Sequence, residues 1–201
     1  MSERERPDLN HVRDAMREED ERASREGETS APSRIAQDTA GRGAHARHSL
    51  LHEAEGLRTF AVVLRRGDQV CESLLNFANE QGLSAASVTG IGAFSRATLG
   101  FFDWERKDYD RIQVDEQVEV LSLTGDIALA PDTTPQPHLH VVLGKPDGSA
   151  HGGHLLEGEV RPTLELVITE TPPGLHRRHD PESGLALIAP EDEGEGSRRA
   201  R

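Results

Sequence analysis

Two short apolar segments that carry histidines, separated by a loop-forming stretch, constrain this chain more than any other feature. Residues 137–144 read PHLHVVLG, residues 151–156 read HGGHLL, and the sequence KPDGS at 145–149 lies between them. This pattern predicts an antiparallel hairpin. On its first strand His138 and His140 share a face, about 7 Å apart, because side chains alternate in direction along a strand.

The length of the loop decides whether a third histidine joins this pair. If all five loop residues are unpaired, His154 lies directly across from His140, with Cβ atoms about 5 Å apart. If the Asp-Gly pair alone forms a tight turn, the register slips by one and His154 points to the other face. We favour the longer loop, because Pro146 has no N–H to donate beside a tight turn.

Three imidazoles without a thiolate are the donor set of an open zinc site, in which water or a ligand takes the fourth position. Imidazole also suits nickel, copper and iron, so the spacing leaves the identity of the metal open. The alternative is that the three histidines line a wet crevice or a subunit interface. His151 points to the opposite face in the favoured register, and we expect it to be a surface residue.

Asp126 and Glu157 are the acidic candidates for a supporting role: Asp126 precedes His138 by 12 positions, and Glu157 follows His154 by three. Either carboxylate could orient a ligating histidine from behind, or act as a general acid or base. The alternative is that Asp126 and Glu157 are surface or strand-end carboxylates with no role at the histidines. We expect a binding site rather than an active site and assign no catalytic residue.

Composition divides the chain into four parts. Residues 1–53 and 191–201 are rich in charged and small residues and have no continuous apolar face, which predicts a disordered extension and a disordered tail. Residues 54–172 are long enough for one domain with a single core. Residues 173–190 are interpreted as a tail that docks on this domain.

Charge and cysteine content limit the function. The net charge is −13, and residues 57–172 hold 17 acidic against 9 basic side chains, a surface that repels a phosphate backbone. Cys71 is the only cysteine, and we expect it to be a small buried side chain rather than a nucleophile. The N-terminus lacks the apolar core of a secretory signal, and no segment is apolar enough to span a membrane, so we expect a cytoplasmic protein.

One helix and several strands are predicted. Apolar residues recur every three or four positions between Asp68, the expected N-cap, and Gly82, the expected end of the helix. Strands are predicted at 57–65, 85–94, 97–104, 110–114, 118–129, 138–144, 154–157 and 163–169. The sequence therefore predicts an α+β fold with a mostly antiparallel sheet of about seven strands and one main helix.

These elements, in this order, resemble the PPC domain family of plants and prokaryotes. The resemblance runs from about residue 57 to residue 169. It rests on FAVVLR at 60–65, ESLL at 72–75, VTGIGA at 88–93, ATLGFFD at 97–103, VLSLTG at 120–125, HLHVVLG at 138–144 and GGHLLEG at 152–158.

The resemblance implies a homotrimer, and it supports a bound metal, zinc first, at His138, His140 and His154. Plant members carry an AT-hook, Arg-Gly-Arg-Pro, but residues 40–45 (AGRGAH) lack the proline and the second flanking arginine. We therefore expect a trimeric binding or regulatory protein with a small anionic ligand. A DNA-binding or DNA-associated transcriptional regulator is the alternative, and a metal-dependent hydrolase or lyase is a third hypothesis.

The segment after residue 171 is similar to the tail of some bacterial members of this family. Residues 180–188 (DPESGLALI) fit that outline and predict a final short strand. His176 and His179 flank Arg177 and Arg178, a sequence typical of a solvated basic patch. A fourth metal ligand from this loop is the alternative interpretation.

Overall fold

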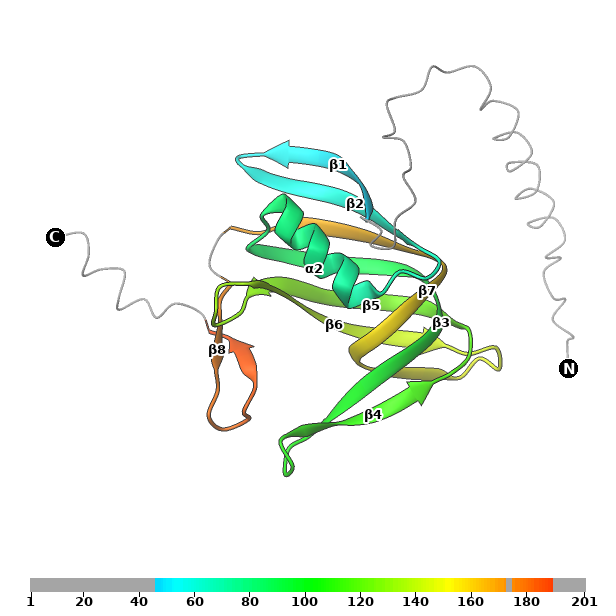
Figure 1. The fold of residues 1–201 in the computed structure, drawn as a ribbon. Coiled ribbons are helices and arrows are strands. Elements are labelled where there is room, and N and C mark those ends of the chain that lie inside the picture. Colours follow the sequence, from blue (N-terminus) through cyan, green and yellow to red (C-terminus); the bar gives the residue numbers. More distant parts are fainter. Residues whose placement is uncertain (1–45, 173–174, 190–201) are drawn as a thin grey trace, which may run out of the picture. The chain divides into compact units, whose positions relative to one another are not determined.

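The computed structural model describes residues 46–172 and 175–189, whose fold is shown in Figure 1. Within these residues, seven strands form one sheet, one helix packs against it and two short strands form a separate hairpin. The strands of the sheet are β1 (Arg47–Ala54), β2 (Leu57–Arg65), β3 (Ala85–Asp103), β4 (Asp108–Val114), β5 (Val118–Leu129), β6 (Pro135–Gly144) and β7 (Ala150–Glu170). The other elements are α2 (Val70–Gln81), β8 (Arg177–His179) and β9 (Ala186–Ile188).

The sheet is antiparallel throughout and closes on itself. Its order is β1-β2-β7-β6-β5-β3-β4, and β3 also pairs with β7. This extra pairing is possible because β7 is long: its first residues pair with β6, and the rest of the strand pairs with β3 and β2. The predicted α+β class, with about seven mostly antiparallel strands and one main helix, is confirmed.

Helix α2 forms where the apolar residues recur at helical spacing. Its buried residues are Val70, Ser73, Leu74, Phe77 and Ala78. The expected end at Gly82 is confirmed, since this residue is left-handed and its N–H caps the last turn. The expected N-cap is wrong: Gln69 holds that position, and the Asp68 carboxylate accepts a hydrogen bond from the Arg65 N–H instead.

Alternation along each strand decides which side chains enter the core. On β6, Leu139, Val141 and Leu143 are buried with the apolar side chains of α2, whereas His140 and Val142 are exposed on the opposite face. Figure 1 shows α2 lying across one face of the sheet. The core therefore fixes the register of β6, and with it the face on which the histidines lie.

Some boundaries differ from the predicted ones. Residues 47–53, expected at the end of a disordered extension, form most of strand β1, which pairs with β2. Strands β3 and β7 each join two predicted strands into one, because β-bulges shift their register without ending the pairing. The rest of the expected extension, residues 1–45, and the expected tail at 191–201 lie outside the described residues.

The β8–β9 hairpin lies against the end of β5. The Leu129 N–H donates a hydrogen bond of 3.0 Å to the Leu175 carbonyl, and Leu129 forms a parallel bridge with His176. Three of the residues expected to form the tail, 173, 174 and 190, lie outside the described part of the chain. No helix of the described residues has the length and hydropathy that a membrane span requires.

Candidate metal centre

The loop between β6 and β7 brings the three histidines to one place. Lys145 N–H donates to the Ser149 carbonyl across the loop, and Gly144 pairs with Ala150. His140 therefore lies directly opposite His154, and the register predicted for the five-residue loop is confirmed. His138 lies two residues before His140, on the same face of β6.

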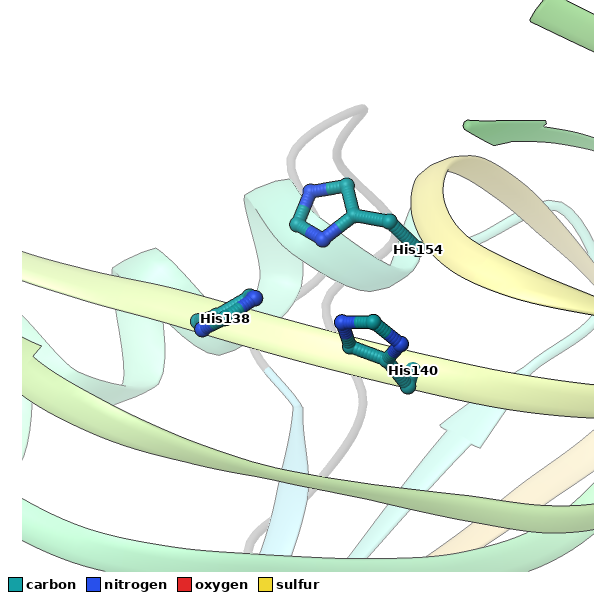
Figure 2. Close-up of side chains that lie close together, drawn as sticks. All are labelled: His138, His140 and His154. Atoms are coloured by element: carbon teal, nitrogen blue, oxygen red, sulfur yellow. The ribbon is translucent and has the colours of Figure 1, made fainter. Parts of the chain in front are cut away.

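The three imidazole rings face a common space, as Figure 2 shows. One nitrogen from each ring can be chosen so that all three lie within 4.8 Å of one another. The ring centroids are 5.2 Å apart for His138 and His140, 5.0 Å for His138 and His154, and 5.4 Å for His140 and His154. This convergence fits three ligands to one ion, with a small inward movement to metal–nitrogen distances of about 2 Å.

His154 is held by an aromatic neighbour that the sequence analysis did not identify. Its ring stacks on Tyr109 of β4, with centroids 5.0 Å apart and planes inclined by 24°. Gly100, the β3 partner of His154, leaves room for this contact, since a Cβ there would lie 2.6 Å from the Tyr109 ring.

The His154 Nδ1 atom is buried and has no hydrogen-bond partner. A buried ring nitrogen without a partner is costly, and a metal ion is one way to satisfy such an atom.

The site favours neutral imidazoles. Burial, followed by the positive charges of His138 and His140, lowers the pKa of His154 from 6.5 to about 4. Burial and then the charge of Arg177 also lower the pKa of His138, against the opposing effect of Asp126. Only a neutral imidazole offers a lone pair to a metal, so these two rings are ready to act as ligands at neutral pH.

The structure separates the two carboxylates that were proposed to support the histidines. Asp126 lies opposite His138 in the β5–β6 ladder, and its Oδ2 atom is 3.9 Å from the His138 Nδ1 atom. Glu157 accepts a hydrogen bond from Thr98 and forms an ion pair with Arg111. Of the two carboxylates, Asp126 is therefore the one that the structure places beside the histidines.

A buried arginine adjoins Asp126. Arg177 on β8 is only 4% exposed, and its guanidinium group donates a short hydrogen bond to the Asp126 carboxylate. The expectation of a solvated basic patch is thus wrong for Arg177, although Arg178 and its histidine neighbours in this hairpin are exposed. No local sequence pattern could have identified this ion pair, because its partners are 51 positions apart.

Two other residues singled out in the sequence lie away from the three-histidine cluster. His151 is exposed and pairs with the core residue Leu143, which places it on the opposite face from His154, as predicted. Cys71 is partly buried against the core, and burial raises the pKa of its thiol. A thiol with a raised pKa is a poor nucleophile, which agrees with the packing interpretation.

Comparison with known families agrees with this fold. A family model, the Plants and Prokaryotes Conserved (PCC) domain, matches residues 51–172, more than half of the chain. The protein belongs to this family, also known as PPC, and the resemblance noted in the sequence is confirmed.

Solved structures of prokaryotic proteins share the fold. A plant- and prokaryote-conserved protein from Pyrococcus horikoshii is 31% identical, with a TM-score of 0.63 over 73% of this chain and 96% of that one. A metal-containing protein from Archaeoglobus fulgidus is also 31% identical, with a TM-score of 0.61 over 73% and 99%. A candidate DNA-binding protein from Bacteroides thetaiotaomicron is 30% identical, with a TM-score of 0.65 over 72% and 99%. No curated protein matches the chain.

Proposed function

We propose that this protein is a homotrimeric binding or regulatory module in which His138, His140 and His154 hold a divalent metal ion, zinc by preference. The observation that carries the proposal is the convergence of three imidazole nitrogens within 4.8 Å on two paired strands. The buried, unpartnered Nδ1 atom of His154 and the lowered pKa values of two of the rings add to it.

The donor set fits zinc in an open site. Three neutral imidazoles fill three positions of a tetrahedron and leave the fourth for water or another ligand. A bound zinc ion would act there as a Lewis acid that attracts a small anionic ligand. The relative from Archaeoglobus fulgidus, a metal-containing protein, supports the presence of a metal in this family.

The surroundings favour binding over catalysis. A metal-dependent hydrolase or lyase needs a carboxylate or imidazole free to accept and return a proton near the metal. Asp126 adjoins the histidines, but its carboxylate is already paired with Arg177, and Glu157 is engaged with Thr98 and Arg111. We assign Asp126 the task of orienting His138 from behind, as carboxylates do for many metal-bound histidines.

DNA binding is the second candidate, because the Bacteroides thetaiotaomicron relative is a candidate DNA-binding protein. The charge of this chain opposes direct contact with DNA. Residues 57–172 carry 17 acidic and 9 basic side chains, so phosphate groups would be repelled by most of the domain. We therefore place the metal-binding module first.

A metal assay on paired histidine variants tests the proposal. Untagged protein purified without added metal is expected to contain about one zinc ion per chain, measured by plasma mass spectrometry. The His140→Ala variant should lose most of this metal, because two imidazoles hold zinc far more weakly than three do.

His151→Ala is the matched control, since it removes an imidazole from the same hairpin on the opposite face. This variant should keep the full metal content. Wild-type protein without metal, or equal metal content in the His140→Ala and wild-type proteins, would refute the proposed site.

A further inference from the structure

The β8–β9 hairpin lies beyond residue 172, where the family match ends, yet it contacts Asp126, the carboxylate beside His138. The contact is made by Arg177, which is buried and donates to Oδ1 of Asp126. The other carboxylate oxygen of Asp126, Oδ2, lies 3.9 Å from the Nδ1 atom of His138. One carboxylate thus connects the hairpin to one of the proposed metal ligands.

Two features set the position of the Asp126 carboxylate. Asp126 itself lies on β5 directly opposite His138, so its place along the sheet is fixed by the strand ladder. Only the rotation of its side chain is left to be set, and the bond from Arg177 sets it.

Arg177 is not needed to attach the hairpin to the sheet. The backbone bond between Leu129 and Leu175 and the bridge between Leu129 and His176 already make this connection. Burying a guanidinium group is expensive, and the Nε atom of Arg177 is buried without a hydrogen-bond partner. A well-packed apolar side chain would anchor the hairpin at lower cost, so anchoring alone does not account for this residue.

We propose that Arg177 is a positioning residue of the metal centre, acting through Asp126 on His138. Arg177 holds the Asp126 carboxylate beside Nδ1 of His138, which favours the tautomer with its proton on Nδ1. The lone pair of His138 is then on Nε2, available to the metal. The C-terminal hairpin is therefore part of the site. This inference rests on the proposed metal-binding function.

The test uses the full-length protein and measures zinc affinity by competition with a chromophoric chelator. Asp126→Asn and Arg177→Met are expected to weaken zinc binding by about 10-fold to 100-fold, the usual effect of losing a group that orients a metal ligand. The double variant should lose no more than the larger single effect, because the two residues act as one unit. Arg177→Lys, which keeps the charge, should restore part of the affinity.

Ser183→Ala is the matched control. Ser183 is buried in the same hairpin, and its hydroxyl bonds Asp180, not the histidine cluster. A role for the hairpin in stability alone predicts that Ser183→Ala lowers zinc affinity as much as Arg177→Met does. The positioning role predicts wild-type affinity in Ser183→Ala, even if its melting temperature falls.

A spectroscopic readout examines the tautomer directly. Nitrogen-15 spectra of the imidazoles in metal-free protein should show His138 with its proton on Nδ1, and a mixture of tautomers in Asp126→Asn and Arg177→Met. Should Arg177→Met fail to fold, Asp126→Asn and Arg177→Lys carry the test. Wild-type affinity and an unchanged tautomer in Asp126→Asn and Arg177→Met, or in Asp126→Asn alone if Arg177→Met does not fold, would overturn the inference while leaving the metal site intact. Failure of the proposed metal site is a separate outcome: wild type and His140→Ala would then contain equal amounts of metal.

Discussion

His154 shows how single residues prepare this site. Its backbone position follows from the pairing with His140, and its ring position follows from the stack on Tyr109. The surroundings then keep the ring neutral, with a pKa of about 4. Metal binding is favoured when a ligand is already held in place and deprotonated, because neither rotation of the ring nor loss of a proton then opposes it.

The lowered pKa of His154 makes the stability of the metal-free protein depend on pH. The pKa of His154 is about 4 in the folded protein, whereas the ordinary pKa of a histidine is 6.5. Between these values the unfolded chain binds more protons than the folded one, so the free energy of unfolding falls as the pH decreases through this window. We expect a loss of about 1 kcal/mol from this residue between pH 7 and pH 5, after allowing for partial exposure of the ring.

Urea unfolding of chelator-treated protein at both pH values measures this effect. Carboxylates with lowered pKa values, such as Glu170, also weaken the fold in acid, so the comparison must be made against a variant. His154→Gln keeps a polar side chain and removes the titration, and it should lose less stability than wild type between pH 7 and pH 5. An identical loss in both proteins would contradict the assigned pKa.

The β5–β6 pair is the element that supports the first two histidines, and a glycine permits its close approach. A Cβ added to Gly125 would lie 1.9 Å from the carbonyl oxygen of His138, far inside van der Waals contact. Gly125→Ala should therefore force β5 and β6 apart next to His138. We expect a loss of more than about 2 kcal/mol in the free energy of unfolding, together with weaker zinc binding.

Gly152→Ala is the control for this variant. Gly152 lies in β7 opposite Val142, and the nearest heavy atom to an added Cβ is 3.2 Å away, the Val141 carbonyl oxygen. Chemical denaturation and chelator competition should show a small change for Gly152→Ala and a large one for Gly125→Ala. Similar effects in the two variants would contradict the steric argument.

How much of the structure follows from the sequence also differs by element. The β6–β7 register was predictable, because loop length and the chemistry of proline set it locally. Strand β1 was missed because every one of its residues is exposed, so it has no buried face to produce an alternating pattern. The joined strands β3 and β7 were divided because bulges resemble strand ends in a sequence. The pairing of Arg177 with Asp126 depends on tertiary structure alone.

The whole molecule has an apolar face that a single subunit leaves open to solvent. It lies on the side of the sheet opposite the core, where Ile91 is 62% exposed and Leu121 is 56% exposed. Val167 and Val142 are 44% and 42% exposed. A hollow of about 600 Å³ lies in this face, lined by residues of β2, β3, β5 and β7. A clustered apolar surface of this kind marks an interface, and a symmetric assembly of identical chains would cover it.

One variant on each side of the sheet tests the proposed trimer. Leu121→Asp places a charge in the open apolar face, and burying that charge in an interface would be costly. The wild-type trimer has an expected mass of about 66 kDa, three chains of 22.0 kDa each. The variant should therefore be a monomer. Leu75→Asp is the control, since Leu75 is exposed on α2, which covers the other face of the sheet. Light scattering coupled to size-exclusion chromatography measures both masses.

The same samples separate assembly from metal binding. All three proposed ligands come from one chain, so the Leu121→Asp monomer should keep its zinc. Thr124, which lines the hollow, pairs with His140, so the open apolar face extends to the edge of the metal centre. Covering this face should slow the exchange of bound metal with a chelator, and the monomer should release zinc faster than the Leu75→Asp protein does. A wild-type monomer, or a trimer that persists in Leu121→Asp, would show that the subunits do not meet through this face.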